Sequence, residues 1–515
     1  MREITTAVVC GLALLAAASA PRAVAQKPRP PNIIVILADD LGYGDTGVYG
    51  SKIIRTPNID ALAADGVRFT QAYVTHPVCA PSRAAILTGR YRQRFGWEFN
   101  PVGRDRQGGV SQSEAFIGQI LKTAGYATGM VGKWHLGEAP GYQPLDRGFD
   151  EFFGITTGAS AFMTAFKPGD EAHTPTGAEG SYRTTVAADP LPPGATEMDR
   201  MASVRRMAPV RRGREVVEVS DYLTDAFTDD AVRFIGAHKD RPFFLYLAYN
   251  APHTPLQAPK AYIDRYRDVA DPGKRVYAAM VSALDDGVGA VRAKLRAEGL
   301  ERNTLIIFLS DNGCAGYVLG ACSNAPLNGF KGMHLEGGVR VPYIVAWPGR
   351  IKGGRVDARV VSSLDITPTA AALAGATLPH GTDGVDLLPY VTGRNAATPN
   401  PTVYWRAGPN FAIRDGTWKL WSVNRADPSE AASAGAEVTP DGVQATVSPL
   451  GAYDMLYDLA ADTGEGRNLS AARPDILAKL KARIAAWDKG NIAPQWTSMR
   501  QAVRRQDGVL VKIYD

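Results

Sequence analysis

The chain has 515 residues, of which 45% are hydrophobic and 21% charged, and its formal net charge is +5. This is the composition of an ordinary soluble globular protein, and so small a charge bias argues against a nucleic-acid partner. The length exceeds that of one ordinary domain and predicts a large α/β domain with a smaller companion.

The first 25 residues have the pattern of a secretory leader. Arg2 precedes an apolar run at residues 7–20, and Ala23-Val24-Ala25 offers a small-x-small cleavage site before Gln26. The run is too short to span a bilayer and no later stretch is long enough, so an uncleaved anchor is the weaker interpretation. We predict that residues 1–25 are a signal peptide and that the mature protein, without a membrane span, is exported, most simply to a bacterial periplasm.

The first strong structural signal is the unbroken apolar run at residues 33–38. It predicts a central parallel strand buried on both faces. The run ends in Asp39-Asp40, and open α/β sheets place their ligands at the carboxyl ends of strands. Two adjacent carboxylates repel each other and need a partner, which a hard divalent cation supplies. The alternative, that Asp40 merely caps a turn, stays open here.

A short loop, Cys79-Ala80-Pro81-Ser82-Arg83, follows a predicted helix at residues 56–63 and a predicted strand at residues 67–73. Pro81 fixes its own φ and restricts Ala80, which predicts that Cys79 lies in a rigid, non-helical turn. Ser82 is predicted to cap a following helix, whose positive end would favour binding of an anion near Cys79. The alternative is a buried, inert cysteine beside a helix cap.

Residues 113–124 have helical spacing, and a short predicted strand at residues 126–131 leads to Gly132-Lys133-Trp134-His135. In an extended segment Lys133 and His135 leave from the same face, because side chains alternate along a strand. A lysine and a histidine that converge suit an anionic group. An isolated buried histidine would more often be structural.

Residues 155–220 lose periodicity and gather Gly, Pro, Thr and Ala. Long loops without secondary structure in a compact domain are usually functional lids or disordered, so we interpret this segment as a variable insertion that forms a substrate loop. Its arginines could meet a polyanionic sugar or simply belong to a solvated basic loop, and both interpretations stay open. These arginines are Arg205, Arg206, Arg211, Arg212 and Arg214.

Two further buried strands are predicted after helical patterns at residues 223–235 and 277–295. The first leads to His253, which lies between two prolines and has few helical hydrogen bonds to make. The second ends in Asp311-Asn312-Gly313. With the earlier aspartate pair, this makes four oxygen donors at the ends of two strands, a set suited to Ca²⁺ or Mg²⁺. Taken alone, Asp-Asn-Gly is more often a turn.

The pattern of predicted elements changes from residue 402 onward. Residues 403–421 predict a hairpin with an Asp-Gly turn, residues 456–459 a strand and residues 471–488 a helix. We therefore predict two units, residues 26–395 and an α+β subdomain at residues 396–515.

The Cys79 loop continues into Leu87-Thr88-Gly89-Arg90, and the whole segment resembles the signature of type I, formylglycine-dependent sulfatases of the alkaline phosphatase-like superfamily. The resemblance spans about residues 31–469. It implies a large, mixed, mostly parallel central sheet flanked by helices, with a smaller C-terminal antiparallel sheet plus helix. Other segments that resemble the family are the Asp39-Asp40 opening, Gly-Lys-Trp-His-Leu-Gly, the histidine after the strand and residues 328–342.

The resemblance implies that a formylglycine-generating enzyme oxidises Cys79 to Cα-formylglycine, whose hydrate is the nucleophile. It implies that Arg83 steadies this hydrate. It also implies that Ca²⁺, or Mg²⁺ in its place, is bound by Asp39, Asp40, Asp311 and Asn312.

The remaining roles concern charge and protons. The resemblance implies that Lys133 and Lys331 offset charge on the sulfuryl oxygens. His253, with Lys331, would protonate the leaving alcohol, and His135 would take the proton of the second hydroxyl so that sulfate departs. His334 and Glu336 match no family role.

The function implied is that of a sulfuric ester hydrolase acting on a sulfated carbohydrate or an aryl sulfate, similar to arylsulfatases and N-acetylgalactosamine sulfatases. One alternative is a phosphate or phosphonate ester hydrolase of the same superfamily. A non-catalytic relative that binds sulfated sugars is another, and it would be expected to lack part of the residue set. The particular substrate is not readable, because variable loops build its pocket.

Four cysteines are present, and Cys10 would leave with the leader. If Cys79 is converted, Cys314 and Cys322 remain as an even pair separated by a short loop. An oxidising compartment could bridge them, and two free thiols are the alternative.

Overall fold

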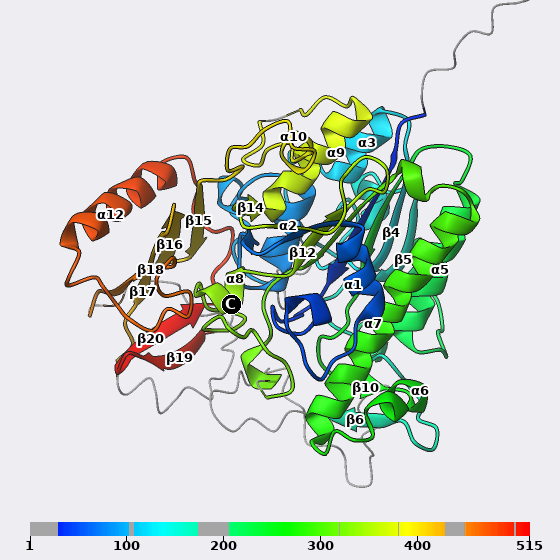
Figure 1. Ribbon diagram of the computed structural model, residues 1–515, viewed down its shortest axis with the longest axis horizontal. Helices are drawn as coiled ribbons and strands as arrows, with labels where there is room; N and C mark the ends of the chain where they lie inside the picture. The colour runs from blue at the N-terminus through cyan, green and yellow to red at the C-terminus, as the bar shows by residue number, and fades with distance from the viewer. Residues whose placement is uncertain are drawn as a thin grey trace, which may run out of the picture.

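Figure 1 shows the computed structural model of the chain. The structure describes residues 29–101, 108–173, 205–318, 320–379, 381–427, 448, 450–498 and 501–514. The predicted signal peptide and the middle of the predicted insertion lie outside the described residues. No helix in these ranges is long and apolar enough to cross a membrane.

A ten-stranded sheet forms the centre of the larger unit, in the order β13-β2-β12-β11-β1-β9-β4-β5-β7-β8. The five strands from β11 to β5 are all parallel, whereas the pairs β2–β12, β11–β12, β5–β7 and β7–β8 are antiparallel. The sheet is therefore mixed, with a parallel centre, as predicted. Its strands are β1 (Asn32–Ala38), β2 (Gly66–Phe69), β4 (Ala127–Lys133), β5 (Glu151–Ile155), β7 (Arg211–Arg212), β8 (Glu215–Val216), β9 (Phe243–Ala248), β11 (Thr304–Ser310), β12 (Tyr343–Ala346) and β13 (Arg355–Asp357).

Strand β1 is buried throughout because helices cover both faces of the sheet. Alternate side chains join two different cores: Ile34 and Ile36 pack with residues of α5 and α7, and Ile33 and Val35 with residues of α2, α3 and α9. Because both faces are buried, residues 33–38 form an apolar run in which polar and apolar residues do not alternate. The helices are α1 (Pro57–Ala64), α2 (Cys79–Thr88), α3 (Ile117–Thr123), α5 (Leu223–Ala237), α6 (Lys260–Ile263), α7 (Pro272–Ala297), α8 (Glu336–Val339), α9 (Ile366–Ala374) and α10 (Leu388–Val391).

The C-terminal part contains a four-stranded antiparallel sheet covered by one helix (Figure 1). The Asp415-Gly416 turn joins two of its strands as predicted, with Gly416 at φ 61°. Leu480 and Ile484 pack the helix against the sheet. The elements are β15 (Thr402–Ala407), β16 (Asn410–Asp415), β17 (Trp418–Asn424), β18 (Ala452–Asp458) and α12 (Pro474–Asp488).

A final hairpin, β19 (Gln501–Gln506) with β20 (Val509–Tyr514), was not predicted. Its turn residues Asp507 and Gly508 both have positive φ, as a type I′ hairpin turn requires. The boundary at residue 395 stays a prediction. It falls between α10 and β15.

The structure corrects the prediction for the Cys79 loop. Helix α2 begins at Cys79 itself, with Val78 as its N-cap, so Cys79 is not in a non-helical turn and Ser82 caps nothing. Proline in the first turn is compatible with a helix because its missing N–H would have no intrahelical partner there. Cys79 still lies at the positive end of the helix.

The described part of the predicted insertion contains short strands instead of continuous loop. Strand β6 (Glu171–His173) pairs with β10 (Leu256–Ala258), and β7 and β8 extend the central sheet. Its arginines largely contact the protein itself: Arg205 donates to Ala161 O at 3.0 Å, Arg212 pairs with Asp230 at 2.7 Å, and Arg214 pairs with Asp146 at 2.6 Å.

Candidate active site

Two neighbouring strands and one helix N-terminus meet at one edge of the sheet. The register pairs Ala38 of β1 with Ser310 of β11, so the residues that follow, Asp39 and Asp311, emerge side by side. The Asp311 amide donates to Ala38 O at 3.0 Å. Cys79 Sγ lies 3.5 Å from Asp39 Oδ1. The ends of β1 and β11 and the start of α2 therefore lie together at this edge.

Arg83 lies at the centre of this cluster, fully buried. Its Nε and Nη2 lie 2.8 and 2.7 Å from Asp311 Oδ2, and its Nη1 donates to Lys133 O at 2.8 Å. Its Nη2 is also 3.6 Å from Asp39 Oδ2. Arg83 thus fixes the ends of β11 and β4 relative to each other.

Two lysines neutralise the aspartate pair. Lys133 Nζ lies 2.6 Å from Asp39 Oδ2, and Lys331 Nζ lies 2.8 and 2.9 Å from the two carboxylate oxygens of Asp40. Asp40 itself has φ 64°, a left-handed backbone unusual for a residue other than glycine. Such strain is typical of functional sites.

Three carboxylates and three cations therefore share one buried site. Burial would raise the pKa of Asp39, but the cations of Lys133 and Arg83 outweigh burial and hold that pKa far below its usual value. Burial and the neighbouring Asp39 charge raise the pKa of Asp311 to about 7. The Cys79 thiol is also affected, because burial raises its pKa to about 12. A thiol in this state is a poor nucleophile at neutral pH.

The donor set fits a hard cation. Asn312 Nδ2 donates to Asp40 Oδ1 at 2.7 Å and to Gly313 O at 2.9 Å, whereas its Oδ1 is buried without a hydrogen-bond partner. Ligand atoms of Asp39, Asp40, Cys79 and His253 lie within 4.8 Å of one another. Asp311, by contrast, turns one oxygen to Arg83. The residues that could hold a cation are therefore Asp39, Asp40, Asp311 and Asn312, with His253 close by.

His253 faces the aspartates. Its Nδ1 is 2.7 Å from Thr254 O and donates to it, so Nε2, 3.7 Å from Asp40 Oδ2, is the free acceptor. Burial and the nearby Lys331 lower the pKa of His253 to about 4. The neutral ring must therefore gain a proton before it can act as an acid.

His135 reaches the site by a route that the sequence did not predict. It has φ 61°, so the segment after Lys133 is not extended and the same-face argument was wrong. Burial and Lys133 lower the pKa of His135 well below its usual value. A Cβ at Gly158 would lie 2.7 Å from His135 Nε2, which explains the glycine there. His135 is thus a neutral ring able to accept a proton.

Sequence reasoning missed two residues of the site. Tyr317 donates to Asp40 Oδ2 at 3.2 Å, and Asn100 Oδ1 accepts from the Ala80 amide at 3.0 Å in the first turn of α2. The two cysteines on either side of Tyr317 were a signal that the loop is fixed. For Asn100 there was no such signal.

The structure also places three other residues that were singled out in the sequence. Cys314 and Cys322 form a disulfide, one of the two alternatives left open. Glu336 accepts from Tyr73 at 2.6 Å and pairs with Lys419 at 2.8 Å, away from Cys79.

Comparison with known proteins identifies the family of this chain. The sulfatase family model matches residues 31–376, and the model of the N-sulphoglucosamine sulphohydrolase C-terminal region matches residues 330–426. Human arylsulfatase A is 36% identical over 91% of this chain and 89% of its own length. N-acetylgalactosamine-6-sulfatase of Canis lupus familiaris is 33% identical over 91% and 87%.

A solved structure is similar as well. The crystal structure of Ps i-CgsB in complex with k-i-k-neocarrahexaose has a TM-score of 0.75 and 33% identity, covering 91% of this chain and 95% of the other. Sequence motifs, site geometry and relatives of nearly full length all agree. The chain belongs to the sulfatase family and is a sulfuric ester hydrolase.

Proposed function

We propose that this chain removes sulfate from a sulfated carbohydrate through a formylglycine nucleophile derived from Cys79, together with Ca²⁺ or Mg²⁺. The observation that carries the proposal is the buried cluster in which Cys79 Sγ lies 3.5 Å from Asp39 and beside the lysine-paired aspartates. The carbohydrate is favoured because one relative is named N-acetylgalactosamine-6-sulfatase and one similar solved structure holds k-i-k-neocarrahexaose. An aryl sulfate is the alternative substrate, since arylsulfatase A is similar too.

The charges support an anionic ester. With Asp311 ionised, the carboxylates of Asp39, Asp40 and Asp311 balance the cations of Arg83, Lys133 and Lys331, so the cluster is neutral by itself. A bound divalent cation would add two positive charges and supply Lewis-acid stabilisation of charge on oxygen. These two extra positive charges would stabilise an anionic sulfate ester as it approaches a nucleophile that still carries its proton.

The chain's own residues would then carry the chemistry. The hydrate of formylglycine bears two hydroxyls on one carbon: one attacks sulfur and gives up its proton as the S–O bond to the alcohol breaks, and that proton replaces the one that the leaving alcohol takes up. Lys133 and Lys331 offset charge on the sulfuryl oxygens. The alcohol takes a proton from Lys331, or from His253 once the substrate's negative charge has raised its proton affinity.

His135 completes the cycle. It accepts the proton of the second hydroxyl, the carbonyl re-forms and the C–O bond to sulfate breaks, so that water can hydrate the aldehyde again. Its neutral ring at Gly158 suits this task. Over one turn, ester plus water gives alcohol plus hydrogen sulfate.

We also propose that the protein is exported, most simply to a periplasm. The support is the leader pattern of residues 1–25 and a disulfide, which forms and persists in oxidising compartments. A formylglycine-generating enzyme would then be a maturation partner.

The test combines mass spectrometry with paired assays. Protein produced with and without a formylglycine-generating enzyme is digested with trypsin, and the peptide at residues 69–83 reports the fraction of converted Cys79. We expect hydrolysis of a sulfated-saccharide panel to rise in proportion to that fraction, and phosphate esters of the same alcohols to react far more slowly. Full activity of unconverted protein, or a preference for phosphate esters, would overturn the proposal.

A further inference from the structure

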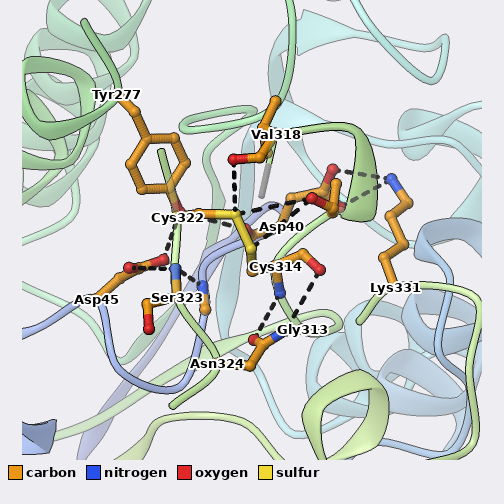
Figure 2. The surroundings of a disulfide bond; sticks show 12 residues. Asp40, Asp45, Tyr277, Gly313, Cys314, Val318, Cys322, Ser323, Asn324 and Lys331 are labelled. Carbon is orange, nitrogen blue, oxygen red and sulfur yellow. Dashed lines mark hydrogen bonds and ion pairs between the residues drawn. A yellow bond between two sulfur atoms is a disulfide. The ribbon is translucent and has the colours of Figure 1, made fainter. Parts of the chain in front are cut away.

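The loop after β11 is closed by the disulfide directly beside the cation-ligand candidates. Cys314 and Cys322 are both buried, with their Cα atoms 6.0 Å apart, and Cys314 follows Asn312 by only two residues. Figure 2 shows this disulfide with Asp40 and Lys331 in its surroundings. We call residues 314–322 the disulfide loop.

Tyr317 is carried by the disulfide loop, on a single 3-10 turn at Gly316–Val318. The turn is tightened by hydrogen bonds from the Val318 amide to Ala315 O at 3.0 Å and from the Cys322 amide to Val318 O at 3.2 Å. The Tyr317 hydroxyl donates to Asp40 Oδ2 at 3.2 Å. A short covalent ring thus carries a donor to one of the two adjacent aspartates.

The base of the disulfide loop is tied to other parts of the site. The Cys314 amide donates to Asn324 Oδ1 at 2.9 Å, and Cys314 O accepts from the Lys331 amide, also at 2.9 Å. On the other side, the Ser323 amide donates to Asp45 Oδ1 at 2.8 Å (Figure 2). These hydrogen bonds therefore fix the disulfide loop to both the segment that carries Lys331 and the segment after β1.

We infer that Tyr317 is a positioning residue for Asp40 and that the disulfide acts on the cation site through Tyr317. The inference rests on the proposed function, in which Asp40 is a cation ligand. Asp40 Oδ1 is held by Asn312 and Lys331, and Tyr317 adds a neutral donor to Oδ2, which Lys331 also contacts. Outer hydrogen-bond partners of this kind typically change metal affinity by about 10–100-fold.

A purely structural disulfide makes a different prediction. A ring of this size restricts the unfolded chain and would therefore raise global stability. It would leave cation affinity unchanged. Cation affinity therefore separates the two roles, whereas global stability does not.

The experiment measures Ca²⁺ binding to the cation-free protein by titration calorimetry. Four proteins are compared: wild type, Tyr317→Phe, the double variant Cys314→Ala/Cys322→Ala, and the triple variant that combines all three substitutions. We expect Tyr317→Phe and the double variant each to bind about 10-fold more weakly. The triple variant should be no weaker than the double variant, because residues that act through one contact are not additive. As a matched control, Tyr453→Phe in β18 removes a hydroxyl far from the site and should leave binding unchanged.

Chemical reduction covers the case in which the double variant does not fold. Dithiothreitol gives two electrons and two protons to the disulfide, which becomes two thiols as the reagent closes to its own ring disulfide. Reduced wild type should then show the same weaker binding. Equal affinity of wild type, Tyr317→Phe and reduced protein would overturn the inference and leave the proposed function intact. Failure of wild type to bind Ca²⁺ or Mg²⁺ would instead overturn the proposed cation, and the inference with it.

Discussion

Arg83 and Asp311 form a fully buried, two-pronged ion pair, in which Nε and Nη2 of the guanidinium lie 2.8 and 2.7 Å from one carboxylate oxygen. The third nitrogen of the same guanidinium donates to Lys133 O. A planar fork with several fixed donors can make these contacts at once, and an ammonium group cannot. The pair therefore joins helix α2, strand β4 and strand β11 at the site.

We predict that Arg83→Lys keeps the charge but lowers kcat/KM by about 10–100-fold, because the Lys133 carbonyl and Asp311 lose their common donor. Steady-state kinetics on a sulfated substrate check this, and urea unfolding reports any change in stability. Arg94→Lys is the control, since Arg94 lies outside the Cys79 signature and pairs with Asp383 through a partly exposed side chain. If Arg83→Lys were as active as wild type, the fork geometry would have no role.

Removal of divalent cations should abolish activity, and Ca²⁺ or Mg²⁺ should restore it. The reason is the set of hard oxygen donors at Asp39, Asp40, Asp311 and Asn312, which lacks the thiolates that favour Zn²⁺ in closed sites. Added Ca²⁺ should also raise the unfolding temperature of chelator-treated protein, because a ligand at 100 times its Kd stabilises by about 2.7 kcal/mol. Recovery of activity with Zn²⁺ alone would contradict this prediction.

The central fold was predictable because the parallel strands β1, β4, β9 and β11 are buried on both faces. Runs such as Ile33–Ala38 carry that signal locally, and their polar C-terminal residues identify the active edge. The start of α2 was not predictable, because Pro81 is compatible with either a turn or a helical first turn. Nor was the left-handed backbone of His135, or the contact of its ring with Gly158, a position where a Cβ would lie 2.7 Å from Nε2.

The contacts of the disulfide loop also could not be predicted from the sequence. Tyr317 donates to Asp40 across 277 positions of the chain, from within the loop that the Cys314–Cys322 disulfide closes. Such contacts join residues that are hundreds of positions apart. No local pattern encodes them, although the paired cysteines mark the loop as fixed.

A buried ionic cluster between α8 and β17 predicts a pH dependence of stability. Lys419 lies 2.8 Å from Glu336 and 3.0 Å from Glu465, with all three side chains buried. Burial raises the pKa of Glu465 from its usual 4.5 to about 7, although Lys419 opposes this. An acid whose folded pKa is raised stabilises the fold below its unfolded pKa and loses that contribution as pH rises to the folded value.

Glu465→Gln removes this titration while it keeps the shape of the side chain. Between pH 4.5 and about 7, the free energy of unfolding of wild type should therefore fall relative to that of Glu465→Gln, by a few kcal/mol at most. Urea unfolding at a series of pH values measures the difference. The exposed Glu215→Gln serves as control and should follow wild type. Parallel curves for wild type and Glu465→Gln would show that Glu465 stays charged throughout.

The last prediction concerns the nucleophile itself. Cys79→Ser should abolish turnover yet permit a single sulfuryl transfer, whereas Cys79→Ala should abolish both. The argument is that serine has one hydroxyl, which can attack sulfur once. The product has no second hydroxyl on the same carbon from which His135 could take a proton, so the sulfate stays bound to the side chain until external water releases it.

Mass spectrometry of Cys79→Ser after incubation with substrate should show the peptide at residues 69–83 with an added sulfuryl group. Rapid-quench kinetics should show a burst of alcohol of no more than one equivalent. Cys79→Ala is the matched control, because it keeps the buried surroundings of the first turn of α2 and lacks any nucleophile. Steady turnover by Cys79→Ser would mean that a single hydroxyl suffices, and the need for formylglycine would be refuted.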